Sequence, residues 1–370
     1  MIVSQSIFNK TGGSYLNKGQ SLNEQYISQL AKIGIPTITV TSADPKIKIM
    51  PPEDIVQEKT RANAIQKVYD AFHSVEETGR LDVNAMQTVS DKIIFDIIQR
   101  KENLVQLTDI RLHDTYTFAH SVNVAILSAM VGNMCHYSKE DLSILTLGAL
   151  LHDLGKIKVP SEILNKPSRL DNEEFYVIQH HPQDGARRIQ EMSDMLPAPS
   201  VLAAIAAQHH EHVDGKGYPR NLRGDQMHRF AKIVAIADVY DALTSERPYK
   251  KAYTPSIAYN LMVNVNKGQF DAKMLNLFFN NVAIYPVGTV LKTIFGFGVV
   301  THCDFGRTAT PKICIFADRN GKMLDKPVRR DLSEEHSDER IIEMVVTGIE
   351  LLHFIHELSV DPSIYLVNEK

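Results

Sequence analysis

The sequence contains few cysteines, and their spacing matches no known cysteine motif. Of 370 residues only three are cysteine, Cys135, Cys303 and Cys314, and no CxxC pair occurs. We therefore expect neither a disulfide framework nor a zinc site built from thiolates.

Long apolar runs and a surplus of either charge are also missing. The longest apolar run, Ile144 to Leu151, is shorter than the roughly 18 residues that a membrane span needs. The first residues lack the basic start and apolar core of a secretory signal. With 40 basic and 44 acidic residues the formal net charge is −4, whereas proteins that bind nucleic acid usually carry a basic face. We expect a soluble, cytoplasmic protein with neither a membrane nor a nucleic acid polymer as its partner.

The length allows two or three domains, and the hydrophobic periodicity predicts a mainly α protein. Proline at positions 51 and 52 and a change of pattern near residue 283 separate small units at both ends from a helical centre. The expected units are a small mixed α/β unit (1–52), a helical connector (53–110), a helical domain (111–282) and a β-rich unit with a terminal helix (283–370).

Local signals predict the ends of individual elements. In the N-terminal unit, β-rich runs at 2–8 and 35–40 flank a helix that begins with a capping pattern at 21–24. An amphipathic stretch at 341–358 predicts the terminal helix. Short runs separated by glycines predict the C-terminal strands, at 287–291, 296–301 and 312–316.

Within the helical centre, caps and prolines set the expected boundaries. Ser138, Asp171 and Thr254 are suited to cap helices, because a short polar side chain can accept from the free N–H groups of the first turn. We expect Pro182 to interrupt one helix and the alanine-rich segment 201–211 to form another.

The histidines are clustered in one part of the sequence. Ten of the 15 histidines lie in under a third of the chain. Such a concentration, with few cysteines, suggests metal ligands of the imidazole and carboxylate type. These ten are His113, His120, His136, His152, His180, His181, His209, His210, His212 and His228.

The central pair is His152-Asp153, at the predicted end of a helix. Two adjacent ligands at a helix terminus can point at one cation, and Gly155 is expected to let the backbone turn away from them. For the dipeptide alone, a polar helix end followed by a capping glycine is the preferred interpretation. Four further segments of helical pattern change this balance, since each places histidine or aspartate in an apolar setting, at His120, His181, His209-His210 and Asp238. One shared metal site explains the set better than separate buried side chains, each of which would cost free energy.

The sequence then resembles a known family. Residues 209–219, HHEHVDGKGYP, match the HHExxDGxGYP motif of the HD-GYP subfamily at every specified position. His120, the His152-Asp153 pair and Asp238 resemble the H…HD…D signature of the HD phosphohydrolase superfamily. The resemblance covers about residues 111–282. It implies a bacterial phosphodiesterase of cyclic di-GMP, with an all-helical HD-type bundle and two or three metal ions.

The resemblance also implies which residues hold the ions. The first ion would be held by His120, His152, Asp153 and Asp238. The second would be held by Asp153, His181, His209 and His210, so that the Asp153 carboxylate bridges the two. Some family members bind a third ion with the help of a glutamate, and Tyr116 occupies the position of that glutamate here. We therefore expect two divalent ions. Imidazole and carboxylate ligands suit iron or manganese, with nickel, cobalt or zinc as alternatives.

Substrate contacts follow from the same resemblance. Asp153 and Lys156 are the expected catalytic residues, with a hydroxide between the two ions as nucleophile. Lys156, Tyr218, Arg247 and Lys250 are the expected substrate-binding residues. Each of the three basic residues also fits an ordinary solvated surface position.

Two further roles are expected around this site. Asp241 is expected to orient neighbouring ligands as a hydrogen-bond acceptor. Gly215 and Gly217 are expected to provide backbone angles that other residues resist. The resemblance also implies that the loop that carries them contacts GGDEF-domain proteins.

The predicted function is hydrolysis of cyclic di-GMP to pGpG and, as an open question, onward to GMP. Two alternatives stay open: a catalytically weak cyclic di-GMP receptor, and an HD phosphohydrolase of another nucleotide. The sequence leaves homodimer formation and the input signal undecided.

Overall fold

The computed structural model describes most of the chain. The described residues are 2–3, 7–8, 14–32, 40–41, 55–99, 116–166, 168–245, 252–335, 341–347, 351, 354 and 362–366. Across these residues, no helix combines the length and the low polarity that a membrane span requires.

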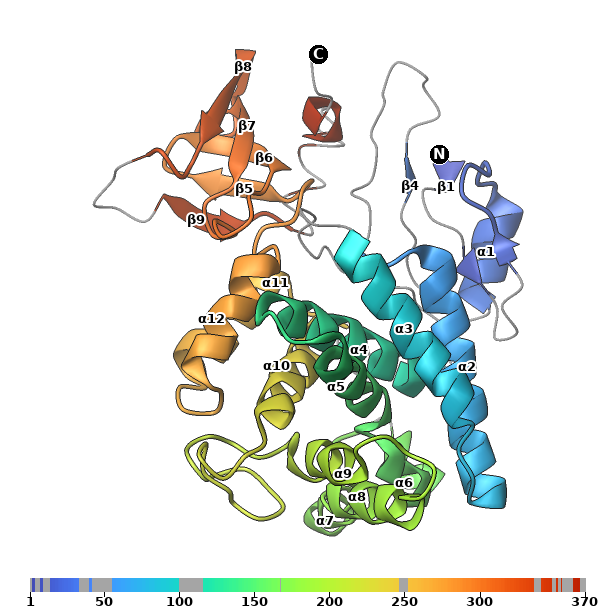
Figure 1. Ribbon diagram of the computed structural model, residues 1–370. Helices are drawn as coiled ribbons and strands as arrows, with labels where there is room; N and C mark the ends of the chain where they lie inside the picture. The colour runs from blue at the N-terminus through green and yellow to red at the C-terminus, as the bar shows by residue number, and fades with distance from the viewer. Residues whose placement is uncertain are drawn as a thin grey trace.

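Helices make up the centre of the molecule, as the periodicity predicted (Figure 1). The long ones are α2 (Glu58–Thr78), α3 (Val83–Gln99), α4 (Tyr116–Met134), α5 (Lys139–Leu151), α8 (His181–Glu191), α9 (Pro199–Gln208), α10 (Arg229–Thr244) and α12 (Ala272–Asn281). Shorter ones are the 3-10 helix η1 (Leu154–Lys158), α6 (Ser161–Leu164), α7 (Asn172–Ile178), α11 (Pro255–Asn260) and the π-helical turn η2 (Leu261–Val265).

The central helices are those without a polar face. α4 packs against α5, α10 and α2, and α5 also contacts α9 and α3. The residues of α10 from Phe230 to Asp241 are almost all buried, which is expected of a helix that is apolar on every side. Two aspartates in such a helix therefore lie inside the bundle.

Caps predicted from the sequence are present. Ser138 accepts from the N–H of Asp141 at the start of α5. Asp171 and Glu174 form a capping box at α7, in which each side chain accepts from the other residue's backbone N–H. Thr254 caps α11, which begins at Pro255.

Three helix boundaries differ from the prediction. The break before Pro182 is present, but Pro182 lies in the first turn of α8, where its missing N–H leaves no bond unmade. α9 occupies Pro199–Gln208 rather than 201–211, so His209 and His210 lie beyond its end. At the N-terminus, Asn23 rather than Ser21 supplies the cap, since its Oδ1 accepts from the N–H of Tyr26.

The C-terminal region carries an antiparallel sheet in the order β8-β7-β6-β5-β9. Its strands are β5 (Val290–Thr293), β6 (Gly296–His302), β7 (Lys312–Ala317), β8 (Met323–Asp331) and β9 (Ile342–Val345). Part of the sheet joins the helical core, because Leu291, Val300 and Ile313 belong to the same buried cluster as the helices. Val299, Cys314 and Phe316 belong to a second, separate cluster. The mainly helical fold class with a β-rich C-terminal region is confirmed.

The expected helix across 341–358 is wrong for its first part. Residues 342–345 form β9, which pairs with the edge of β5, because alternating burial suits a strand beside free backbone groups. Most of the remaining stretch lies outside the described residues, and a short 3-10 helix, η4 (Pro362–Leu366), follows.

The N-terminal unit is described in pieces. β1 (Ile2–Val3) pairs with β4 (Val40–Thr41), and β2 (Ile7–Phe8) pairs with β3 (Ser14–Leu16), beside α1 (Glu24–Lys32). Most of the predicted strand 35–40 lies outside the described residues.

Candidate metal centre

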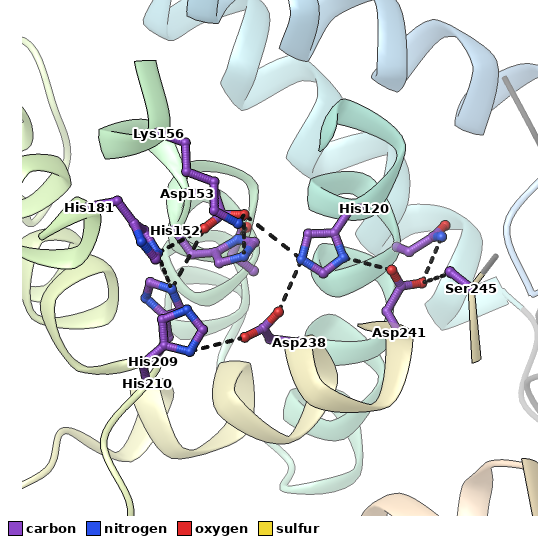
Figure 2. Close-up of polar contacts among 12 residues, drawn as sticks. His120, His152, Asp153, Lys156, His181, His209, His210, Asp238, Asp241 and Ser245 are labelled. Carbon is purple, nitrogen blue, oxygen red and sulfur yellow. Dashed lines mark hydrogen bonds and ion pairs between the residues drawn. The ribbon is translucent and has the colours of Figure 1, made fainter. Parts of the chain in front are cut away.

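The structure brings all seven predicted metal ligands to one place inside the bundle (Figure 2). They come from five segments: His120 from α4, His152 and Asp153 from the end of α5, His181 from the first turn of α8, His209 and His210 from the turn after α9, and Asp238 from α10. The ligands include two groups of three residues, and within each group the ligand atoms lie within 4.8 Å of one another. The first group is His120, His152 and Asp153, and the second is His181, His209 and His210.

Asp153 lies between these two groups. Its Oδ1 faces the Nε2 atoms of His181 at 3.3 Å and His209 at 3.7 Å. Its Oδ2 faces the Nε2 atoms of His152 at 3.4 Å and His120 at 3.9 Å. The carboxylate therefore presents one oxygen to each group, which is the arrangement that a bridging ligand needs.

The tautomers of three histidines follow from their backbone contacts. The Nδ1 atoms of His152, His181 and His209 lie 2.6–2.8 Å from the carbonyl oxygens of the residues three positions earlier. Because a carbonyl oxygen can only accept, each Nδ1 carries the proton and each Nε2 is left with a lone pair.

Those lone pairs point at one another and at Asp153. The Nε2 atoms of His181 and His209 are 3.2 Å apart, with no proton to place between them when both rings are neutral. Among the described atoms, His152 Nε2 and Asp153 Oδ1 are buried without a hydrogen-bond partner. Buried acceptors that converge without a donor fit a cation, so the donor set suits divalent metal ions.

The protonation equilibria point the same way. Burial, followed by the charges of neighbouring histidines, lowers the pKa of His209 well below 6.5, and burial lowers the pKa of His210 to about 3. Burial opposes the ionisation of Asp153, but the nearby His152 and Lys156 outweigh it and hold that pKa well below 3.8. Neutral imidazoles around an ionised carboxylate are the forms that bind a metal ion.

His120 differs from the other histidines, because it contacts two aspartates. Its Nε2 lies 3.0 Å from Asp238 Oδ1, and its Nδ1 lies 2.7 Å from Asp241 Oδ2. Burial opposes its charge most strongly, but these hydrogen bonds outweigh it and raise the pKa of His120 to about 9. The charged form of the His120 ring is therefore favoured between these two carboxylates when no metal ion is bound.

Asp241 makes the contacts that its expected orienting role requires. Its carboxylate accepts from His120, from the amide of Asn123 at 2.8 Å and from the hydroxyl of Ser245 at 3.1 Å (Figure 2). It thereby fixes the ring of His120, in the way that metal-ligating histidines are commonly held. No sequence motif had singled out Asn123 for a role.

Lys156 lies beside the cluster. Its ammonium is 2.5 Å from Asp153 Oδ2, and its side chain is 22% exposed, so it reaches both the carboxylate and solvent. Gly155 differs from the expectation, since it lies inside η1 rather than reversing the chain. It is required for space: a Cβ there would lie 2.0 Å from the carbonyl oxygen of His181.

The GYP loop, residues 211–222, borders the centre. The Tyr218 ring stacks on His210 at 4.8 Å between centroids and meets Phe175 edge-on at 6.4 Å. Phe175 is 47% exposed and had no signal in the sequence. An aromatic surface therefore lies next to the predicted ligands.

Glu211 holds this loop in place, a role that the sequence reasoning missed. Its buried carboxylate accepts from the backbone N–H groups of Arg220 and Leu222 at 2.6 and 2.9 Å. Gly215 adopts the expected positive φ of 81°. Gly217 is needed for a different reason, because a Cβ there would lie 2.3 Å from the backbone nitrogen of His212.

Three predicted residues cannot be assigned contacts. Arg247 and Lys250 lie outside the described residues, between α10 and α11. Tyr116 is the first residue of α4, and its side chain lies outside the described part of the structure.

Sequence comparisons relate this chain to known proteins. Residues 93–274 match the family described as "HD domain". Cyclic di-GMP phosphodiesterase PA4108 of Pseudomonas aeruginosa is 32% identical over 276 residues, which are 74% of this chain and 66% of that protein. The 3'3'-cGAMP-specific phosphodiesterase 1 of Vibrio cholerae is 36% identical over 171 residues, 46% of this chain and 39% of that protein.

A third relative, the cyclic di-GMP phosphodiesterase response regulator RpfG of Xanthomonas campestris pv. campestris, is 35% identical over 179 residues. These are 48% of this chain and 47% of RpfG. This chain belongs to the HD-domain family, as its motifs predicted. It spans about two thirds of the length of PA4108 and less than half of the length of the other two relatives.

Proposed function

We propose that this protein is a metal-dependent phosphodiesterase that hydrolyses cyclic di-GMP to pGpG. The observation that carries the proposal is the position of Asp153, whose two oxygens face histidine Nε2 atoms of two separate groups. The names of PA4108 and RpfG support the same activity and the same substrate for this chain.

Two divalent ions would be held by this donor set. His120, His152, Asp153 and Asp238 would hold one, and Asp153, His181, His209 and His210 the other. Iron or manganese suits ligands of imidazole and carboxylate without thiolate. When bound, the two ions supply a hydroxide nucleophile and positive charge that stabilises the phosphoryl oxygens in the transition state.

The remaining residues bind and orient the substrate. Lys156 would direct its ammonium to the scissile phosphate, because it already lies against the carboxylate that faces both groups. Tyr218 and the adjacent Phe175 offer flat apolar surfaces on which a guanine ring can stack. Arg247 and Lys250 would bind the phosphates of the cyclic dinucleotide.

A turnover assay tests the proposal directly. Protein stripped with a chelator and reloaded with Mn²⁺ or, without oxygen, Fe²⁺ should convert cyclic di-GMP to pGpG, and the stripped protein should not. Asp153→Ala should be inactive under both conditions. Reloaded wild-type protein that binds cyclic di-GMP without cleaving it would instead support the receptor alternative.

A second substrate has support from a specific comparison. The relative from Vibrio cholerae that matches 46% of this chain is named as specific for 3'3'-cGAMP. The same assay with 3'3'-cGAMP and with pGpG decides this point. Faster cleavage of 3'3'-cGAMP would reassign the substrate, and GMP formed from pGpG would extend the reaction by one step.

The GYP loop also remains our proposed contact for GGDEF-domain proteins. Residues such as Lys216 project from it, with a side chain that is 80% exposed. Lys216→Glu should weaken binding of a GGDEF domain without changing turnover, and unchanged binding would contradict this contact.

A further inference from the structure

A chain of hydrogen bonds leads from the buried Arg61 of α2 to the predicted metal ligand His120. Arg61 of α2 donates through Nη1 to Asn123 Oδ1 of α4 at 2.5 Å. The Asn123 amide donates to Asp241 Oδ1 at 2.8 Å, and Asp241 Oδ2 contacts His120 Nδ1 at 2.7 Å. Four side chains from three helices therefore form one continuous polar path.

We propose that Arg61 is a positioning residue of the metal centre, acting through Asn123 and Asp241 on His120. The inference rests on the proposed metal centre and adds a residue that no motif includes. Residues 93–274 match the HD-domain family, whereas α2 lies before that range, at Glu58–Thr78.

Both charged ends of this path are buried. Arg61 is 1% exposed and Asp241 is also 1% exposed, so both charged groups are removed from water. Such burial costs several kcal/mol per ion unless opposite charge and hydrogen bonds compensate. The side-chain amide of Asn123 connects the guanidinium of Arg61 to the buried carboxylate of Asp241.

The hydrogen-bonding groups of the path fix the orientation of the Asn123 side-chain amide. Arginine can only donate, so its contact with Asn123 assigns the amide oxygen to that side and turns the amide N–H₂ towards Asp241. Asp241 then uses its second oxygen for His120 Nδ1, and His120 Nε2 is left facing Asp238 and Asp153. Without Arg61, Asn123 is free to rotate and loosen this chain of contacts.

The path also connects the centre to the N-terminal part of the chain. α2 packs against α4 and η1, and the N–H of Gln57 at its start donates to Asp96 of α3. A displacement of α2 would therefore reach His120 through Arg61 without any contact between the N-terminal unit and the ions.

The test measures Mn²⁺ binding to the chelator-stripped full chain, by the electron paramagnetic resonance signal of free Mn²⁺. Arg61→Met removes the donor and keeps an unbranched chain, and we expect about tenfold weaker binding at the site that contains His120. Ile65→Ala is the matched control, since Ile65 is buried on the same helix one turn further on. The control should lower the melting temperature and leave Mn²⁺ affinity within about twofold of wild type.

A second variant keeps the test decisive if Arg61→Met does not fold. Asn123→Ala breaks the same path without changing α2, and it should weaken Mn²⁺ binding to the same extent. In a double-mutant cycle the two losses should not add, because both variants remove one connection.

The outcomes separate this inference from the proposed function. Normal Mn²⁺ affinity in Arg61→Met with a lowered melting temperature would make Arg61 merely structural and overturn the inference. A wild-type protein that binds Mn²⁺ with the expected Arg61 effect but cleaves no cyclic dinucleotide would overturn the function alone. A wild type that binds no Mn²⁺ would overturn both.

Discussion

Asp153 is the residue on which both halves of the centre depend. Its carboxylate is fully buried, and its two oxygens face different sets of histidines. Removing it would leave the Nε2 lone pairs of both sets without the negative charge that offsets two cations. A single substitution is therefore expected to affect both ions, unlike the loss of any one histidine.

We predict that Asp153→Ala loses both ions and all turnover but keeps its helical content. His181→Ala should weaken mainly the second ion, since His181 faces only Oδ1 of Asp153. The neighbouring His180→Ala is the matched control, because His180 bonds to the carbonyl of Tyr176 and lies outside the cluster. Elemental analysis with circular dichroism measures both effects, and full metal content in Asp153→Ala would contradict the bridging arrangement.

The histidines also predict how metal-free stability depends on pH. The pKa of His120 is raised to about 9 from 6.5, so its contribution is present in full below pH 6.5 and is lost as the pH rises towards 9. This difference corresponds to about 3 kcal/mol. The lowered pKa values of His152, His209 and His210 act oppositely, since these rings charge on unfolding below pH 6.5 and destabilise the fold there.

Chelator-stripped protein should therefore be most stable near pH 6.5. Urea unfolding at a series of pH values, from about pH 5 to about pH 10, measures the expected maximum. His120→Gln should lose the decline on the alkaline side and keep the decline on the acid side. A stability that rises steadily from pH 6.5 to 9 in the wild type would show that His120 is not protonated.

At the scale of elements, the contact between η1 and α8 sets the distance between Asp153 and His181. A Cβ on Gly155 would lie 2.0 Å from His181 O and 2.5 Å from Gly185 N, both backbone atoms that cannot rotate away. We predict that Gly155→Ala separates the two elements, costs about 3 kcal/mol of stability and weakens metal binding at the His181 group more than at the His120 group.

Gly306→Ala is the control for the cost of a new methyl group. Gly306 has a φ of +76°, but a Cβ there meets nothing within 4 Å. Gly306→Ala should lower the free energy of unfolding by about 1 kcal/mol through backbone strain alone and leave the metal content unchanged. Thermal unfolding and elemental analysis of both variants measure the difference, and equal metal content would show that η1 and α8 tolerate separation.

The segment between α10 and α11 carries the predicted phosphate contacts. α10 supplies Asp238 to the centre, and Arg247 and Lys250 follow its end at Thr244 within six residues. An arginine and a lysine there would bind the substrate without touching the ions. We predict that Arg247→Ala combined with Lys250→Ala raises KM for cyclic di-GMP at least tenfold with unchanged metal content. Steady-state kinetics decide this, and an unaltered KM would mean that both residues are ordinary surface groups.

At the scale of the whole molecule, charge limits the number of ions. The described anionic ligands are Asp153 and Asp238, and Asp241 lies one contact further away. A buried divalent ion needs anionic ligands, and the phenol of Tyr116 supplies none near neutral pH because its ordinary pKa is about 10.

We therefore predict two ions per chain, both of which Tyr116→Phe retains. Anomalous scattering at the metal edge counts them in crystals of the active protein. A third strong peak near Tyr116 would contradict this count. Tyr116→Glu is the informative reverse variant, since a carboxylate four residues before His120 lies on the same helix face.

The helical bundle and one part of the C-terminal sheet share the largest hydrophobic cluster of the described residues. That cluster extends from Ile55 to Ile342 and so includes residues of α2 and of the C-terminal sheet. The predicted division at 283 remains a prediction about domains, but removal of the sheet would expose apolar side chains of the helical bundle. The metal centre lies in the helical part of this common core.

The sequence by itself determined the helix caps, the mainly helical class and the types of ligand. Caps such as Ser138 and Asp171 are fixed by residues within one turn, and the spacing of HHEHVDGKGYP is likewise local. Information of this kind needs no knowledge of distant contacts. It also indicated a buried partner for Asp238, because a carboxylate within a wholly apolar helix needs one, and Asp238 Oδ1 lies 3.0 Å from His120 Nε2.

Tertiary structure alone decided how these groups face one another. The orientation of Asp153 depends on contacts with His181 and His209. The path from Arg61 joins Arg61 to Asn123, 62 positions later in the chain, and Asn123 to Asp241, a further 118 positions on. The strand β9 and the need for Gly155 have the same origin, since the edge of β5 and the backbone of α8 impose them from a distance. Periodicity and motifs record only neighbours along the chain, whereas these contacts exist only after helices far apart in the sequence have packed together.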